Sequence, residues 1–398
     1  MSHSGGRPYR AIPGPSVVPD AVLRAMHRAA PNIYAGEIVE LAAGLIPDLR
    51  RLARGAGGVA IYIANGHGAW EAALANVAAP GARVLVAATG RFGHGWAEVA
   101  RARGLEAEIL DFGRHGPADP ARVEAALRAD RDGRIAALLV THVDTATSVR
   151  NDIAALRAAR DAAGHPALLM VDCIASLGCD RFEMDAWGVD VMVAASQKGL
   201  MVPPGLGFVF FNERAAAARA RLERVSKYWD WGPRAAPAEF YQYFGGTAPT
   251  HHLYGLRAAL DMIHAEGLEA VWARHARLAG AIWAACDCWA AGGALRLNIA
   301  DPAHRSHAVT ALRLDPPDGA RLREWLERHA GVTLGIGLGM QSSADPRAEG
   351  AFRIGHMGHV NAHMVLGVLA SIEAGMQALG IARGQGALAA AAARIAAP

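Results

Sequence analysis

The stretch VDVMVAASQKGLMVPPG, residues 189–205, carries the strongest structural signal in the chain. Its first seven residues are almost all apolar, which is typical of a strand buried on both faces of a parallel sheet. Lys198 follows directly after this strand, where burial lowers the pKa of an amine. Because an amine must be neutral to attack an aldehyde, this position suits a lysine that forms a Schiff base. Taken alone, Lys198 is also compatible with an ordinary solvated surface charge.

Similar apolar runs alternate with helix-forming segments on both sides of this stretch. Strands are expected at residues 59–64, 83–88, 106–111, 135–141, 167–172, 189–195 and 207–211. Helices are expected at residues 69–77, 95–103, 120–128 and 152–163. This alternation predicts an α/β fold, with a mostly parallel sheet and helices on both of its faces.

The pattern changes after Tyr254, and a smaller C-terminal α+β domain is expected there. A long helix over 254–291 leads into shorter elements at 308–314, 320–329 and 352–354, and then into a final helix over 362–379. The four prolines of the first twenty residues disfavour regular helix. The predicted division is therefore an extended arm (1–20), a large domain (21–265), a small domain (266–385) and an Ala-rich tail (386–398) that should fray.

Composition excludes several classes of protein. The chain has 398 residues, of which 52% are hydrophobic, and its 40 basic and 37 acidic residues leave a net charge of only +3. Without a basic stripe, no nucleic-acid partner is expected. No apolar run reaches the ~18–20 residues of a membrane span, and no secretory signal is expected. The four cysteines have neither disulfide-framework nor metal-site spacing, so we expect no metal and a reducing, cytoplasmic location.

Asp172 ends the predicted strand over 167–172, and Lys198 follows the next one. An acid at the end of a strand is often no more than a helix N-cap or a metal ligand. A pyridoxal phosphate (PLP) cofactor would give it a sharper role, because a carboxylate beside the pyridine nitrogen keeps that nitrogen protonated and the ring electron-accepting. Since both residues end neighbouring strands, they are expected to face one cleft at the carboxyl edge of the sheet.

Two further loops follow strands of the large domain. Asn65-Gly66-His67-Gly68 leads into a helix whose N-terminal N–H groups could bind a phosphate. The loop lacks the third glycine of a dinucleotide fingerprint, and as a plain connection it would be unremarkable. Phe92, after the next strand, is either a core residue or a ring that stacks on a heteroaromatic cofactor.

Arg353 lies within an apolar strand of the small domain. A buried guanidinium needs a partner, since its desolvation is otherwise costly. It could pair with an internal acid, or hold a substrate carboxylate in a bidentate fork.

Taken together and in order, these segments resemble the class V aminotransferases of PLP fold type I, above all the alanine–glyoxylate and serine–glyoxylate aminotransferases. The resemblance runs from Pro13-Gly14-Pro15 to about Leu379. It implies that Lys198 carries PLP as a Schiff base and that Asp172 faces the pyridine nitrogen. It also implies that Phe92 stacks on the ring and that Arg353 holds the substrate carboxylate.

The resemblance assigns further contacts around the cofactor and the substrate. They are phosphate contacts from Gly66, His67 and Gln197, a hydroxyl from Thr145, an apolar contact from Ile174, a phosphate contact to the neighbouring subunit from Thr247, and substrate contacts from Gly14 and Tyr34. A homodimer with shared active sites is therefore expected.

The chain departs from the family pattern near its N-terminus. Serine– and aspartate–glyoxylate relatives have His-Arg-Ser-Pro where this chain has Asn32-Ile33-Tyr34-Ala35. The Tyr34 region and the segment 353–358 also resemble pyridoxamine–pyruvate aminotransferases. Those enzymes carry an acidic residue in the phosphate loop, whereas this loop has no carboxylate before Glu71, which favours a phosphorylated cofactor.

The resulting prediction is a ping-pong transaminase that moves an amino group from a small amino acid, alanine or serine, to a 2-oxo acid such as glyoxylate. A class V desulfurase or lyase would need a reactive cysteine on an exposed loop, and none of the four cysteines fits. A non-catalytic binding protein of the same fold would be expected to lack Lys198 or Asp172, and both are present.

Overall fold

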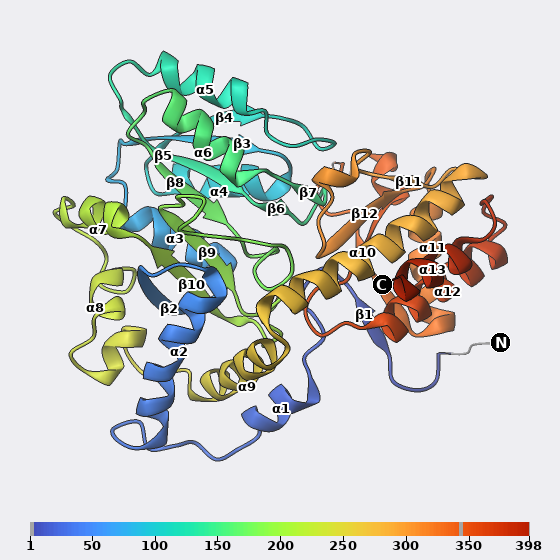
Figure 1. Ribbon diagram of the computed structural model, residues 1–398, viewed down its shortest axis with the longest axis horizontal. Helices are drawn as coiled ribbons and strands as arrows, with labels where there is room; N and C mark the ends of the chain where they lie inside the picture. The colour runs from blue at the N-terminus through green and yellow to red at the C-terminus, as the bar shows by residue number, and fades with distance from the viewer. Residues whose placement is uncertain (1–3, 342–344, 398) are drawn as a thin grey trace.

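The computed structural model describes residues 4–341 and 345–397, which form a large and a small lobe (Figure 1). Residues 1–3 of the predicted arm and residue 398 of the predicted tail lie outside these ranges. The large lobe is built on a seven-stranded sheet and the small lobe on a five-stranded sheet. Among the described residues, no helix has both the length and the apolar character needed to cross a bilayer.

The large sheet has the strand order β2-β10-β9-β8-β5-β3-β4. Its strands are β2 (Gly58–Ala64), β3 (Arg83–Ala88), β4 (Glu106–Asp111), β5 (Ile135–Thr141), β8 (Leu168–Asp172), β9 (Val191–Ala195) and β10 (Gly205–Phe211). β10 runs antiparallel to its neighbours β2 and β9, while the pairs β3–β4, β3–β5, β5–β8 and β8–β9 are parallel. The mostly parallel sheet and all seven predicted strands are confirmed, with ends that differ by at most about two residues.

Helices cover both faces of this sheet, and successive strand residues belong to different cores. In β5, for example, Leu138 packs in one apolar cluster and Leu139 in the other. The first cluster includes residues of α2 (Glu37–Ala53), α5 (Pro120–Ala129), α6 (Ile153–Ala162) and α9 (Thr250–Glu266). The second includes residues of α3 (Gly66–Ala75), α4 (Arg91–Ala102), α7 (Glu213–Ala220) and α8 (Trp231–Ala235). Burial of both faces explains why the inner strands are continuously apolar, whereas the edge strand β4 is partly exposed and carries acidic residues.

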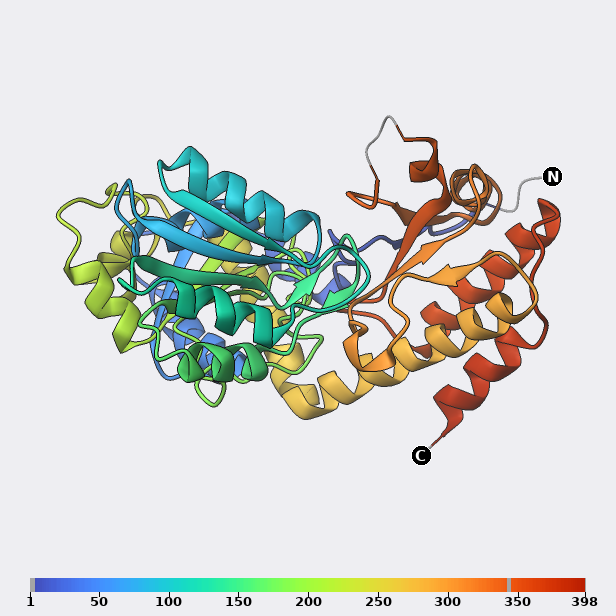
Figure 2. The same ribbon diagram turned by 90° about the horizontal axis from the view of Figure 1, so that it is seen from above.

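The small lobe has the strand order β1-β13-β14-β12-β11. Its strands are β1 (Tyr9–Ala11), β11 (Arg296–Leu297), β12 (Val309–Arg313), β13 (Val332–Ile336) and β14 (Ala351–Gly355). The helices that pack with it are α10 (Leu268–Ala291), α11 (Asp318–Ala330), α12 (Ala362–Ala378) and α13 (Ala387–Ala396). Figure 2 shows α10 running along this lobe beside the helices of the C-terminal segment.

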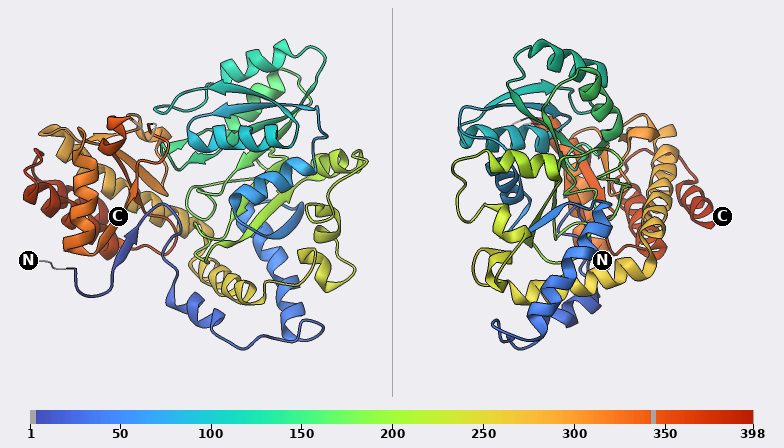
Figure 3. Two further views of the ribbon diagram at one scale, coloured as in Figure 1. Left: turned by 180° about the vertical axis from the view of Figure 1, so that it is seen from behind. Right: turned by 60° about the vertical axis from the view of Figure 1, so that its left-hand side comes forward.

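Both ends of the chain differ from the sequence predictions. The arm is extended as expected, but Tyr9–Ala11 forms β1, which pairs in parallel with β13 of the small lobe. The arm thus joins the small lobe before it continues into α1 (Asp20–Met26) (Figure 3). The prediction of a frayed tail over 386–398 is wrong, because α13 packs against α10 and buries Ala387 and Ala391.

The long helix predicted over 254–291 is two helices, α9 and α10. Gly267 separates them with a φ of +86°, a conformation that favours glycine and interrupts the helical path. The predicted domain division at 265/266 lies beside this break. The remaining elements are the short hairpin β6 (Val143–Asp144) and β7 (Val149–Arg150), and three 3₁₀ turns, Phe240–Phe244, Pro302–His304 and Pro346–Gly350.

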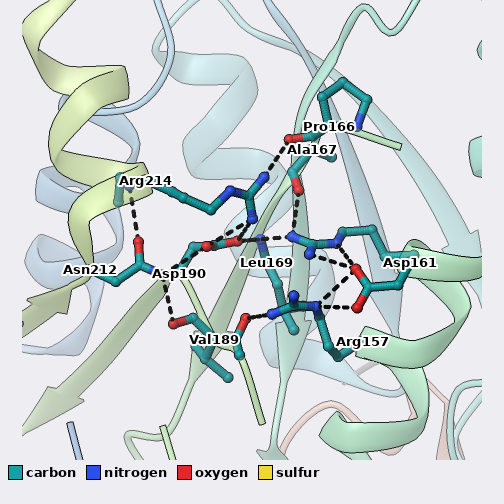
Figure 4. A network of polar contacts seen from close by, with 12 residues as sticks. Arg157, Asp161, Pro166, Ala167, Leu169, Val189, Asp190, Asn212 and Arg214 are labelled. Carbon is teal, nitrogen blue, oxygen red and sulfur yellow. Dashed lines mark hydrogen bonds and ion pairs between the residues drawn. The ribbon is translucent and has the colours of Figure 1, made fainter. Parts of the chain in front are cut away.

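A buried polar network fixes the N-terminal ends of β8 and β9. These ends lie opposite the C-terminal strand ends that lead to Asp172 and Lys198. The carboxylate of Asp190 accepts hydrogen bonds from the Leu169 amide (2.8 Å), from Arg160 (3.0 Å) and from Arg214 (2.9 Å). Figure 4 shows Arg214 and Asn212 converging on this carboxylate. Because the buried acid has several donors, the network can hold the strand starts in register.

Candidate active site

Lys198 lies in the turn between β9 and β10, with its side chain packed among protein atoms. Its Nζ donates a hydrogen bond to the carbonyl of Pro13. Burial of the amine, together with the positive charge of Arg353, lowers the pKa of Lys198 to about 8. Near neutral pH, the neutral amine is therefore far more abundant than in a solvated lysine, as a Schiff-base role requires.

The N-terminal arm covers this lysine. The amide of Ser16 donates to the Gln197 carbonyl (2.9 Å), and the Ser16 hydroxyl donates to the Lys198 carbonyl (2.7 Å). Gly14 has a φ of +99°, and a Cβ there would lie 2.3 Å from Lys198 Nζ. Glycine is thus required for both its conformation and its size. The predicted substrate-binding residue Gly14 lies directly against the predicted catalytic lysine.

Asp172 ends β8 and is only 3% exposed. Its carboxylate accepts hydrogen bonds from Trp70 Nε1 (3.1 Å) and from the Ile174 amide (2.7 Å). Burial raises the pKa of Asp172 to about 7, although both hydrogen bonds favour the ionised form. A cation facing this carboxylate would remove the cost of burying its charge.

Sequence reasoning missed Trp70 as part of the site. The signal was available, since a large buried aromatic with an N–H group needs an acceptor. Trp70 follows the Gly66 loop by about one turn of α3, and its indole N–H finds that acceptor in Asp172.

The phosphate loop expected at Gly66 forms the first turn of α3. A Cβ at Gly66 would lie 2.4 Å from Cδ1 of Ile174, so glycine lets the loop approach that side chain. The side chain of Asn65 accepts hydrogen bonds from the His67 and Gly68 amides, at 3.1 and 3.3 Å. The sequence suggested that these N–H groups would be unpaired, but Asn65 is already a competing partner.

The His67 ring lies at the edge of Trp70, with 4.7 Å between ring centroids. Burial and the positive charges of Arg91 and Lys198 lower the pKa of His67 below its ordinary value. At neutral pH His67 is therefore mainly a neutral hydrogen-bonding side chain.

One cavity gathers every cofactor-binding residue that the resemblance implied except Thr247. Its lining comprises Gly66, His67, Trp70, Phe92, Val143, Thr145, Asp172, Ile174, Ala175, Gln197 and Lys198. The Phe92 ring meets Trp70 edge-on, with centroids 6.2 Å apart. The side-chain oxygen of Gln197 is buried without a partner among the described residues, as expected of a group that faces a bound molecule.

Arg353, in the middle of β14, is 5% exposed. Its Nε donates to the Ile336 carbonyl (2.7 Å) and its NH1 to the Thr145 carbonyl (2.8 Å). Burial lowers the pKa of Arg353 to about 10, although the charge of Asp144 opposes this shift. No ion pair joins Arg353 to a carboxylate within residues 4–341 and 345–397, so the internal partner that the sequence allowed is not observed there.

Four predicted site residues do not line this cavity: Gly14, Tyr34, Thr247 and Arg353. Gly14 and Arg353 line another cavity together. Thr247 is exposed in the loop after Phe240–Phe244, and Tyr34 is 88% exposed between α1 and α2. Neither residue lines the cavity around Lys198. Their roles would require a second chain or another arrangement, and both stay predictions.

The arrangement defines the class of the protein: an α/β enzyme with a buried lysine and a buried acid that follow neighbouring strands and line one cavity. Residues 59–359 match the family described as Aminotransferase class-V. The chain belongs to this class V aminotransferase family, and its fold is fold type I of the PLP enzymes, as predicted.

The relatives agree with this assignment. Serine–glyoxylate aminotransferase from Methylorubrum extorquens is 37% identical over 376 residues, which is 92% of this chain and 90% of the relative. L-aspartate–glyoxylate aminotransferase from Paracoccus denitrificans is 36% identical over 386 residues, which is 93% of this chain and 91% of the relative. The solved structure of pyridoxamine–pyruvate aminotransferase from Mesorhizobium loti has a TM-score of 0.87 and 27% identity, covering 99% of both chains.

Proposed function

We propose that this chain is a PLP-dependent aminotransferase that moves the amino group of a small neutral amino acid to glyoxylate by a ping-pong mechanism. The observation that carries the proposal is the placement of Lys198 and Asp172 in one cavity with Phe92 and Ile174. The activities after which the relatives are named, serine–glyoxylate and L-aspartate–glyoxylate aminotransferase, support glyoxylate as the acceptor.

The residues present fit PLP. Asp172 is an acid whose pKa is raised by burial, and a protonated pyridine nitrogen facing it would stabilise its ionised form. Phe92 and Ile174 offer an aromatic and an apolar surface to a flat ring. Gln197 and His67 add polar groups to the same cavity. When bound, PLP supplies an electron sink for the bond that breaks at the substrate's Cα.

The protein's own residues supply the rest of the chemistry. The Nζ of Lys198 would hold the cofactor and, once displaced by the incoming amine, would accept the proton from the substrate's Cα and deliver it to C4′ of the cofactor. Asp172 would keep the ring nitrogen protonated. Arg353 would hold the substrate carboxylate, because its side chain is already oriented by two backbone carbonyls.

The amino donor is proposed to be alanine or serine. The predicted donor-facing region, near Gly14 and Tyr34, contains the arginines Arg7, Arg10, Arg24 and Arg28. Of these, Arg7 pairs with Asp20, Arg10 hydrogen-bonds Thr333, Arg28 pairs with Glu37, and Arg24 is exposed. A second carboxylate would therefore lack a dedicated partner. A homodimer with Thr247 reaching the neighbouring phosphate completes the proposal, and the cytoplasmic location stays a prediction.

Two alternatives keep the cofactor and change the substrate or the reaction. The likeness to pyridoxamine–pyruvate aminotransferase makes pyridoxamine a second candidate donor, although Asn65-Gly66-His67-Gly68 has no acidic residue to oppose a phosphorylated cofactor. A desulfurase is disfavoured, because Cys173, Cys179 and Cys286 are buried and Cys288 is partly buried. Burial raises the pKa of Cys179 to about 12, which opposes formation of its reactive thiolate.

The decisive experiment adds single donors to the PLP-loaded protein and follows the visible absorbance band of the bound cofactor. Alanine or serine should abolish the band, and glyoxylate should restore it. Faster reaction with aspartate would overturn the assignment of a neutral donor. Reaction with pyridoxamine alone would favour the second candidate, while persulfide formation from cysteine would favour the desulfurase.

A further inference from the structure

Asp144, at the end of β6, is a fully buried acid that the proposed chemistry does not use. One carboxylate oxygen accepts hydrogen bonds from the amides of Phe92 (2.8 Å) and Gly93 (3.3 Å). The other accepts from the amide of Ala146 (2.9 Å). The side chain has no exposed surface, so these backbone donors are its immediate surroundings.

The first pair of hydrogen bonds caps α4 from a distant part of the chain. The N-cap residue of α4 is Gly90, which has no side chain to accept the first N–H groups. Asp144 takes this role across 52 positions of sequence. A Cβ at Gly90 would lie 2.6 Å from Cγ of Asp144, so glycine leaves the space that the carboxylate occupies. The position of Phe92, one residue into α4, thus depends on Asp144.

The third hydrogen bond fixes the turn that carries Thr145. Because Ala146 donates back to Asp144, the Thr145 peptide is held between two fixed points. The carbonyl of Thr145 accepts the 2.8 Å hydrogen bond from NH1 of Arg353. The charge of Asp144 also acts on Arg353 and Asp172, and burial raises the pKa of Asp144 itself. The carboxylate of Asp144 is therefore linked to three site residues, Phe92, Thr145 and Arg353.

We propose that Asp144 is a positioning residue that fixes the positions of Phe92 and Arg353 relative to one another. It thereby couples the binding site of the cofactor to the binding site of the substrate carboxylate. The inference rests on the proposed function only in taking Phe92 as a cofactor contact and Arg353 as the carboxylate clamp. It predicts that disturbing Asp144 weakens both contacts together, although Asp144 lines neither the cavity nor any substrate position.

Two variants test the proposal. Asp144→Asn keeps the size of the side chain but replaces one acceptor oxygen by an NH2 group, which would face a backbone N–H donor. Gly90→Ala keeps the carboxylate and pushes it away from the start of α4. The matched control is Asp190→Asn, a buried acid that also accepts from a backbone amide but lies at the opposite edge of the sheet.

Three quantities are measured for each protein besides the melting temperature. They are the dissociation constant of PLP from the apo form, the visible circular dichroism of the bound cofactor, and the dissociation constant of propionate, a carboxylate without an amine, from the PLP-loaded form. We expect both constants to rise about tenfold or more in Asp144→Asn and Gly90→Ala, as for loss of ~1.4 kcal/mol in each contact. The dichroism should change with them.

The control should lower the melting temperature but leave both constants within about threefold of wild type, or under ~0.7 kcal/mol. If the two Asp144-directed variants match Asp190→Asn in both constants and in dichroism, Asp144 is only a structural cap and the inference fails. If Asp144→Asn does not fold, Gly90→Ala decides by the same criteria. A wild-type protein that binds no PLP would instead refute the proposed function, and this outcome is recognisable before any variant is made.

Discussion

Replacing Asp172 by Asn tests the electronic role of the buried acid. The change keeps the side-chain shape and removes the charge. In the protein, one oxygen accepts from the Ile174 amide at 2.7 Å and the other from Trp70 at 3.1 Å. An amide can satisfy only one of these donors, so Asn would retain the shorter contact and turn its NH2 group toward the indole N–H.

The expected loss of rate is large because the Asp172 carboxylate is buried, where interactions between charges are strong. Burial raises the pKa of Asp172 to about 7 against the opposing effect of its two hydrogen bonds and of Lys198, so a cation facing the carboxylate would stabilise its ionised form further. A protonated ring nitrogen and the carboxylate would stabilise each other, and hydrogen bonds to charged groups contribute ~1.5–3 kcal/mol. Because the interaction strengthens as electrons flow into the ring, we expect a fall of at least about 100-fold in the half-reaction rate, or ~2.7 kcal/mol of barrier.

The assay is a stopped-flow measurement of the cofactor's visible band after mixing with a saturating donor, so that slow product release does not hide the effect. Trp70→Phe is the control, because it keeps the charge and removes one neutral donor. Its rate should fall no more than about tenfold, or ~1.4 kcal/mol. If Asp172→Asn still binds PLP and slows less than tenfold, the carboxylate is a structural cap and the electronic argument is wrong.

Three other residues give direct tests. Borohydride should trap the cofactor on Lys198, while Lys198→Ala should bind PLP without turnover; an adduct on another lysine would refute the assignment. Because the pKa of Lys198 is lowered to about 8, PLP capture by the apo protein should accelerate as pH rises through about 8, where the amine loses its proton, and a rate independent of pH would contradict this. Thr247 should contact the phosphate of a second chain, so a fully active monomer in sedimentation would exclude the shared site. Arg353→Ala should weaken both half-reactions by ~2–5 kcal/mol, with partial rescue by Arg353→Lys, and unchanged kinetics with glyoxylate would place the carboxylate elsewhere.

The large sheet was predictable because its signal is local. The inner strands are buried on both faces and form continuous apolar runs, as in Ile135–Thr141 and Arg83–Ala88, whose predicted ends match the structure. The lysine and the acid were also predictable as neighbours, since they follow adjacent strands of a parallel sheet. No long-range information is needed for either inference.

The features that were missed depend on contacts between distant parts of the chain. β1 has three residues between prolines, and only its pairing with Val332–Leu334 makes it a strand. From its sequence, the Ala-rich α13 segment is expected to fray, and only its packing against α10 identifies it as a stable helix. Asp144 gave no signal either, because the helix it caps begins 53 positions earlier in the sequence, at Arg91. A single sequence shows the residues of such contacts without showing that they meet.

The pairing of β1 with β13 has a consequence for biosynthesis. A chain is made from its N-terminus, so Tyr9–Ala11 emerges long before the residues 332–334 with which it pairs. The apolar elements of the large lobe can collapse earlier, since their partners are already present. Gly14 and Ser16, however, follow a strand that is anchored only near the end of translation, so the covering of Lys198 is completed late. A ribosome that stops before residue 332 would release a chain whose arm has no strand to pair with.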